Sequence, residues 1–148
     1  MTQEDRELLL KDLCARLPYK VIIYRGEKDY IGEDDALLEG IDVISGICKL
    51  RCLPEGTVFV KENVSNIIPF LRPMSSMTEE EKGELKLEQE KDEELFIQVI
   101  NKSQNGDDSL LGTVIPHCAE DWANKNHFDY RGLIEKGLAL KAPEGMYK

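Results

Sequence analysis

Glycines recur through residues 30–60 and divide this part of the chain into pieces too short for helices. They are Gly32, Gly40, Gly46 and Gly56. Residues 47–53 alternate apolar and basic side chains, with Lys49 and Arg51 on the basic side, which is typical of a strand that buries one face. β-branched and aromatic residues at 19–25 and 57–60 indicate further strands. We therefore expect four or five short strands with tight turns, forming a small antiparallel meander or an SH3-like, partly open barrel.

Residue patterns typical of helix N-termini occur both before and after this β segment. Thr2 and Asp5 resemble an N-cap with an acidic third residue, and leucines then recur at helical spacing, so a helix is predicted over about 3–16. Thr78 and Glu81 form a capping box, which predicts a long helix running to about residue 100. The middle of this segment is mostly charged, so a break in the helix or a solvent-bridging stretch is an alternative there. Pro116 predicts the first turn of a last helix, which runs to about residue 126.

Two prolines interrupt the β pattern between residues 64 and 74. Pro69 and Pro73 each lack a backbone N–H group and restrict the residue before them. We therefore expect this segment to be an irregular connector that packs against the β segment.

These patterns predict an α+β fold with an N-terminal helix, the small β unit and C-terminal helices. Residues 1–77 would hold the first helix and the β unit. Residues 78–148 would form a helical region packed on it, so that the whole is one globular unit. Hydrophobic residues make up 41% of the chain and charged residues 32%, a balance that indicates a folded core rather than a disordered chain.

The formal charge of −10 is unevenly distributed. Residues 1–77 hold 13 acidic and 10 basic side chains, whereas residues 78–148 hold 16 and 9. Nucleic acid binding requires several Lys or Arg side chains on one face, and the β-rich half offers such a group. Its members are Lys20, Arg25, Lys28, Lys49 and Arg51, with Tyr19 and Tyr24 as candidate stacking rings. Nucleic acid binding through this half is therefore one hypothesis.

The first residues are acidic and lack the basic start and apolar run of a secretory signal. No apolar stretch approaches the roughly 18 residues of a membrane span, so we expect a cytoplasmic protein without membrane contact. The four cysteines are expected to be free thiols, and no cofactor is expected. The alternative is a zinc site, with the ligands Cys48, Cys52, His117 and Cys118.

The densest group of polar and aromatic side chains lies at residues 122–131. The candidate binding residues are Trp122, His127, Asp129, Tyr130 and Arg131. His127 and Asp129 could supply a general acid and base, but no nucleophile, P-loop or dinucleotide motif accompanies them, so no residue is assigned as catalytic. The structural alternative is that the aromatic rings pack a final helix onto the core, while Asp129 and Arg131 cap and pair around a turn.

Two regions of the chain carry a resemblance to a known family. Residues 71–81 read LRPMSSMTEEE, and residues 127–140 and 142–147 read HFDYRGLIEKGLAL and APEGMY. Both regions resemble the signature of small proteins found in Bacteroides-type gut bacteria and in their prophages or mobile elements. The resemblance implies a bacterial cytosolic origin and an accessory role, and it assigns no activity and no site residue.

The favoured hypothesis for function is a non-enzymatic module that binds another protein. The binding surface would be residues 122–131 or the acidic helix that begins after Thr78. Nucleic acid binding through the β unit is the first alternative. A hydrolase or transferase that uses His127 and Asp129 is the second.

Overall fold

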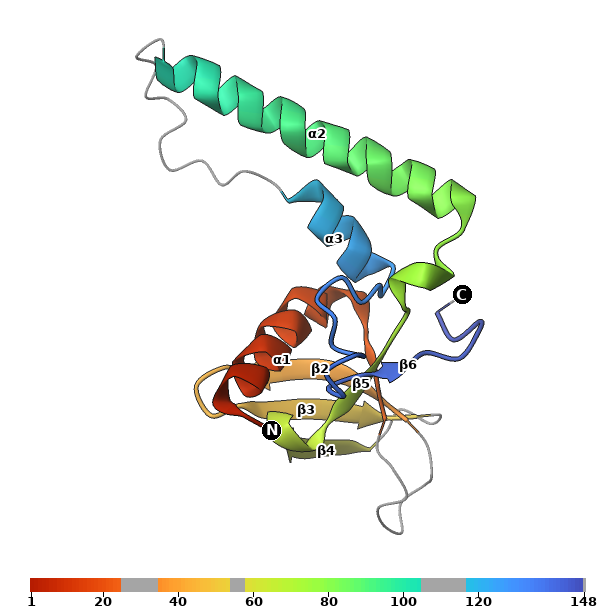
Figure 1. Cartoon of the computed structure of the whole chain (residues 1–148). Helices are drawn as coiled ribbons and strands as arrows, with labels where there is room; N and C mark the ends of the chain where they lie inside the picture. The colour runs from red at the N-terminus through yellow and green to blue at the C-terminus, as the bar shows by residue number, and fades with distance from the viewer. Residues whose placement is uncertain (25–34, 54–57, 105–116, 148) are drawn as a thin grey trace. The chain divides into compact units, whose positions relative to one another are not determined.

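The computed structural model of the chain describes residues 1–24, 35–53, 58–104 and 117–147 (Figure 1). The chain divides into two compact units. The first combines Met1–Ser75 with Asn124–Lys148, and the second is Ser76–Ala123. The C-terminal segment, which the sequence assigned to the helical region, therefore groups with the β unit.

The first unit begins with helix α1 (Gln3–Arg16), whose bounds confirm the predicted helix. The N–H of Asp5 donates to Thr2 Oγ1 at 3.0 Å, and the N–H of Thr2 donates to Asp5 Oδ2 at 3.3 Å. This capping box satisfies backbone donors that a helix start leaves without partners. A 3-10 turn, η1 (Leu17–Tyr19), follows and contains Pro18.

A six-stranded sheet completes the first unit and confirms the predicted α+β fold with an antiparallel meander. Its strands are β1 (Ile22–Tyr24), β2 (Ala36–Asp42), β3 (Ile47–Cys52), β4 (Phe59–Asn63), β5 (Ile68–Leu71) and β6 (Leu140–Lys141). They lie in the order β4-β3-β2-β1-β5-β6, and their pairing is antiparallel except between β5 and β6. Of the two predicted forms, the structure has the open sheet, with β4 and β6 at its edges.

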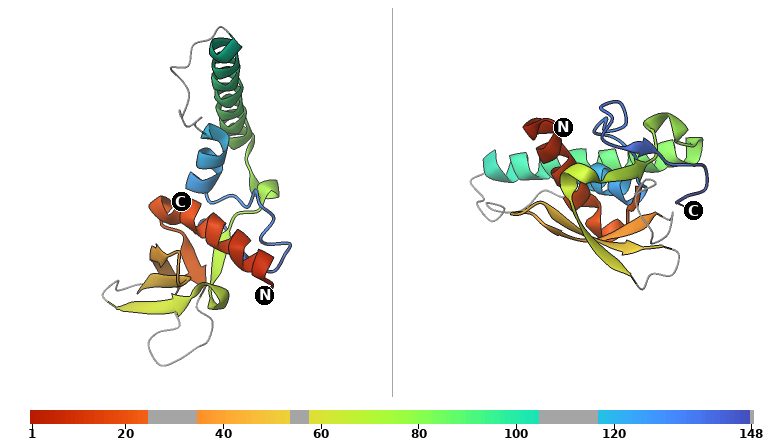
Figure 2. Two further views of the ribbon diagram at one scale, coloured as in Figure 1. Left: turned by 90° about the vertical axis from the view of Figure 1, so that its left-hand side faces the viewer. Right: turned by 90° about the horizontal axis from the view of Figure 1, so that it is seen from below.

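The hydrophobic core lies between α1 and one face of the sheet (Figure 2). In β3 the side chains of Cys48, Leu50 and Cys52 are buried, as the alternation predicted. Cys48 and Leu50 pack with a set of apolar residues that includes Leu9, Leu13, Val21, Ile23, Leu38, Val64, Leu71 and Leu133. Burying one such side chain fully contributes roughly 1.5–3 kcal/mol. This burial decides which face of the meander points outward.

Strand β5 corrects the prediction that residues 64–74 form an irregular connector. Pro69 lies inside the strand and pairs with Ile23 of β1. The proline is tolerated here because β6 begins to pair with β5 only at Phe70, so the missing N–H leaves no gap in that ladder. One 3-10 turn precedes β5, η2 (Val64–Asn66), and another follows it, η3 (Met74–Ser76).

Backbone pairing and one tyrosine hold the C-terminal segment against the sheet. The N–H of Ala142 donates to the carbonyl of Leu71 at 2.8 Å. The Tyr147 hydroxyl accepts the N–H of Ile22 at 3.0 Å and donates to the carbonyl of Phe70 at 2.7 Å. Burial raises the pKa of this hydroxyl to about 12, so it keeps the proton that it donates. These bonds explain why this segment groups with the sheet.

The second unit contains α2 (Glu79–Gln104) and most of α3 (Cys118–Lys125). The predicted capping box is confirmed, because the N–H of Glu81 donates to Thr78 Oγ1 at 3.2 Å and the N–H of Thr78 donates to Glu81 Oε2 at 2.9 Å. The charged middle of α2 remains helical, supported by pairs one turn apart such as Glu88 with Lys91. Among the described helices, none is long and apolar enough to cross a membrane.

The start of α3 is capped by a carboxylate from α2. Asp92 Oδ1 accepts the N–H of Cys118 at 2.8 Å, and Oδ2 accepts the N–H of Ala119 at 3.0 Å. Burial acts to raise the pKa of Asp92, but these hydrogen bonds outweigh it and hold the pKa below its usual value. The ionised carboxylate therefore also suits the positive end of the α3 dipole.

Candidate functional site

The face of β2, β3 and β4 that points away from the core carries three rows of paired residues, which we call the outer sheet face. The rows follow from the strand register and are Leu37, Arg51 and Phe59; Gly40, Lys49 and Lys61; and Asp42, Ile47 and Asn63. A β-bulge at Glu39 shifts the register of β2 between Leu38 and Gly40. The bulge is what places a glycine, rather than a side chain, beside Lys49.

Two lysines face each other at the centre of the outer sheet face. Lys49 of β3 and Lys61 of β4 are direct cross-strand partners, and both side chains are exposed. Among the described residues, neither ammonium group has a carboxylate within ion-pair distance. Like charges directly opposite one another destabilise a sheet. An anionic ligand between the two lysines would remove this cost.

An exposed aromatic ring lies beside the lysine pair. Phe59 of β4 is 51% exposed, and Lys49 Nζ lies 4.5 Å from the centre of its ring. The cross-strand partner of Phe59 is Arg51, whose guanidinium forms an ion pair with Glu39 at 2.6 Å. The ring is thus oriented by a cation on one strand while half of its surface stays open.

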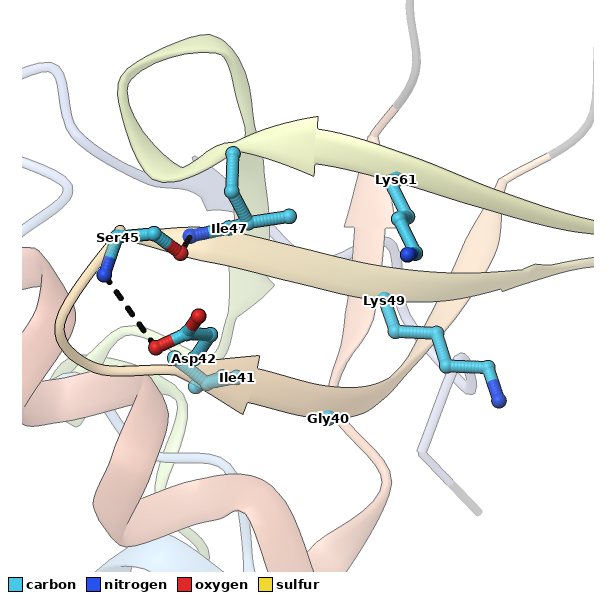
Figure 3. Close-up of a pocket in the computed structure, with 7 residues that line it drawn as sticks. All are labelled: Gly40, Ile41, Asp42, Ser45, Ile47, Lys49 and Lys61. Carbon is cyan, nitrogen blue, oxygen red and sulfur yellow. Dashed lines mark hydrogen bonds between the residues drawn. The ribbon is translucent and has the colours of Figure 1, made fainter.

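A hollow of about 380 Å³ lies next to the two lysines (Figure 3). Its lining residues are Gly40, Ile41, Asp42, Ser45, Ile47, Lys49 and Lys61. Glycine within a strand often marks a place where a ligand can approach the backbone. The Asp42 carboxylate at one end accepts the N–H groups of Ile44 and Ser45 at 3.0 and 3.3 Å, and the hydrogen bonds from Ser45 hold its pKa below the usual value. This carboxylate therefore belongs to the turn between β2 and β3.

The predicted basic residues are only partly brought together. Lys49 and Arg51 lie on the outer sheet face, but Lys20 follows η1 in a left-handed conformation with φ of 57°, and Arg25 and Lys28 lie outside the described residues. Of the two tyrosines, Tyr24 packs edge-on against Phe70. Phe59 and Lys61 were not among the binding residues predicted from the sequence. Their alternation with Val60 and Glu62 was the available signal.

The residues singled out at 122–131 have partners within the chain. The indole N–H of Trp122 donates to Glu84 Oε2 at 3.1 Å, within the second unit. Asp129 is buried, and its two oxygens accept the N–H groups of Leu133 and Ile134 at 2.8 and 2.9 Å. Asp129 therefore caps the turn that follows it.

His127 is buried in an uncommon backbone conformation. Its φ is 61°, the residue is 7% exposed, and its ring stacks on Tyr147 with 3.7 Å between ring centres. Burial, with a further contribution from the cations of Arg16 and Arg72, lowers the pKa of His127 to about 4. Nδ1 has no hydrogen-bond partner in the described part of the chain. The imidazole is thus neutral near pH 7, and Asp129 does not orient it through Nδ1, so we do not propose catalysis by this pair.

Arg131 and Tyr130 belong to a buried charge cluster around Asp12. Asp12 Oδ1 accepts from Arg131 Nη1 at 2.9 Å and from Arg16 Nη2 at 3.0 Å, and Oδ2 accepts from Arg16 Nε at 2.7 Å. Arg16 Nη2 also donates to the carbonyl of Phe128 at 2.7 Å. Both guanidinium groups lie over the ring of Tyr130, at 5.6 and 4.6 Å from its centre. This cluster fastens the C-terminal segment to α1.

The cysteines give no sign of a metal centre in the parts of the chain that the structure places. Cys48 and Cys52 are buried in the core, and burial raises the pKa of the Cys48 thiol to about 11, so this thiol keeps its proton. Within the described residues, no group of three or more His, Cys, Asp or Glu side chains could hold a metal ion.

Comparison of the chain with protein-family models, with curated proteins and with solved structures gives no match. Its function is therefore inferred from the geometry of the outer sheet face.

Proposed function

We propose that this chain is a non-enzymatic binding protein whose outer sheet face takes single-stranded nucleic acid. The observation that carries the proposal is the cross-strand pair of Lys49 and Lys61, which lacks a carboxylate partner among the described residues and lies beside the half-exposed ring of Phe59. Proteins that bind single strands combine cations that follow the phosphates with aromatic rings that stack on the bases. The outer sheet face offers both groups.

Several features favour a single strand over a duplex. The exposed ring of Phe59 can stack on an unpaired base, whereas the bases of a duplex are already stacked on each other. The hollow beside Gly40 gives a phosphate room to approach Lys49 and Lys61. The chain's acidity does not oppose the proposal, because the first unit carries 16 acidic and 15 basic residues, whereas the second carries 13 and 4.

Origin and location are part of the same proposal. The segments at 71–81 and 127–147 support a bacterial cytosolic protein with an accessory role, through their resemblance to small proteins of gut bacteria and mobile elements. A nucleic-acid-binding accessory protein would be consistent with that setting.

A charge-removal experiment tests the proposal. In the Lys49→Gln/Lys61→Gln variant, binding to a fluorescent oligothymidylate of about twelve nucleotides is expected to weaken at least about tenfold at ~50 mM salt, because two phosphate contacts are lost. Fluorescence anisotropy measures the dissociation constant. Circular dichroism checks that the variant is folded, which is expected because both side chains are exposed.

The matched control is Lys11→Gln/Lys136→Gln, which removes the same charge from exposed positions of the first unit outside the outer sheet face. Its affinity should stay within about twofold of wild type. If the Lys49/Lys61 variant binds like wild type, or if the wild type does not bind, the proposal is wrong. Preferential binding to vesicles of anionic lipid or to a polyglutamate peptide would also reject nucleic acid as the ligand.

A further inference from the structure

Helix α2 has one side that is partly buried and one side that is exposed. Within its unit, α3 meets α2 through Glu84 and Asp92, and the half-buried positions of α2 recur at helical spacing. These positions are Glu81, Leu85, Glu88, Asp92 and Leu95. Since α3 has 8 residues and α2 has 26, α3 can shelter only a part of one side.

The opposite side of α2 carries a stripe of exposed residues, which we call the outer stripe. Leu87, Glu90, Glu94 and Ile97 follow one another at intervals of three and four residues, so they share one helix face. Leu87 is 59% exposed and Ile97 is 56% exposed. Two large apolar side chains thus lie at the ends of the stripe, with two carboxylates between them.

The two glutamates of the outer stripe repel each other. Glu90 and Glu94 are one turn apart, and like charges at this spacing destabilise a helix. Neither has an ion-pair partner among the described residues, and the neighbouring Lys91 pairs with Glu88 instead. A cationic partner between them would relieve the repulsion, in the same way as the apolar ends would gain from being covered.

We infer that the outer stripe binds a basic amphipathic helix of a partner protein. Such a helix can place Lys or Arg against Glu90 and Glu94 while its own apolar residues cover Leu87 and Ile97, which is the usual way in which a helix binds a partner helix. A second copy of the chain is the wrong occupant, because the second unit carries 13 acidic and 4 basic residues and would be brought against its own charge. This site is independent of the nucleic-acid surface on the sheet.

The inference is tested with a synthetic peptide as the probe. The probe is a helical Leu/Lys peptide of about 18 residues with its leucines on one face. Isothermal titration calorimetry at ~150 mM salt should show that Leu87→Ala/Ile97→Ala weakens binding at least about tenfold and that Glu90→Gln/Glu94→Gln weakens it at least about fivefold. Alanine and glutamine are good helix formers, so α2 should remain folded in both variants, and circular dichroism checks this.

The control is Glu135→Gln/Glu144→Gln, which removes two exposed carboxylates from the first unit. It should leave the affinity for the peptide within about twofold of wild type. If the apolar variant binds like wild type, the interaction is general charge attraction and the inference is wrong. Self-association of the wild-type chain that the apolar variant abolishes, measured by analytical ultracentrifugation, would equally overturn it.

Discussion

Replacing Asp12 by asparagine is expected to lower the free energy of unfolding by about 3–5 kcal/mol, because a buried ion pair loses its only carboxylate. Asp12 is fully buried, as is Arg16, and its two oxygens accept three hydrogen bonds from Arg16 and Arg131. Asparagine keeps the shape of the side chain but not its charge. Two guanidinium groups would then face each other with no counterion between them.

Urea denaturation followed by circular dichroism measures this change. Glu135→Gln is the control, because it removes an exposed carboxylate of the same unit and should change the free energy by no more than about 0.5 kcal/mol. A loss below about 1 kcal/mol for Asp12→Asn would show that the cluster does not fasten the C-terminal segment to α1.

Acidification from pH 7 to 4 is expected to remove about 3 kcal/mol of stability through His127 alone. The pKa of this side chain is about 4 in the fold, against a usual value of 6.5. A lowered histidine pKa means that the neutral form is the one that the fold accommodates. The stabilisation is therefore complete above pH 6.5 and is lost as the pH falls from 6.5 to 4. Protonation would place a third cation near Arg16 and Arg72.

The variant His127→Asn separates this effect from the titration of carboxylates. Asparagine tolerates the left-handed backbone that His127 adopts at φ of 61°, but it does not titrate. Urea denaturation at several pH values should show that the wild type loses about 3 kcal/mol more than the variant between pH 7 and 4. Parallel curves for the two proteins would mean that His127 is protonated in the fold as readily as in the unfolded chain.

The parts of the fold that were predicted from the sequence depend on neighbouring residues. Thr2 with Asp5, and Thr78 with Glu81, form their capping bonds within one helical turn, so the two helix starts could be located in advance. The buried face of β3 likewise follows from alternation within six residues. Each of these signals is complete within a short window of the chain.

The parts that were not predicted depend on residues far apart in the sequence. Pro69 is compatible with a strand because it pairs with β1 while β6 begins to pair with β5 only at Phe70, and neither partner strand is near it in the sequence. Asp12 and Arg131 form an ion pair although they lie 119 positions apart in the sequence, so Arg131 could not be recognised as a structural residue from its neighbours. The same holds for Tyr147, whose partners are in β1 and β5.

Only part of the candidate site could be predicted from the sequence, because some of its features arise within one strand and others arise between strands. The alternation of β3 placed Lys49 and Arg51 on one face, but the pairing of Lys49 with Lys61 and its contact with Phe59 depend on the register between β3 and β4. The bulge at Glu39 brings Gly40 beside Lys49, and it cannot be recognised from a pattern in a single sequence. Register and bulges are properties of the assembled sheet.

The salt dependence of oligonucleotide binding distinguishes a phosphate site on the outer sheet face from any other means of attachment. For the wild type, the logarithm of the association constant should fall linearly with the logarithm of salt concentration. In Lys49→Gln/Lys61→Gln, the slope should become shallower by about 1.4, since each phosphate contact to a single strand contributes about 0.7. An unchanged slope in this variant, with binding retained, would contradict the assignment of Lys49 and Lys61 as the phosphate-binding residues.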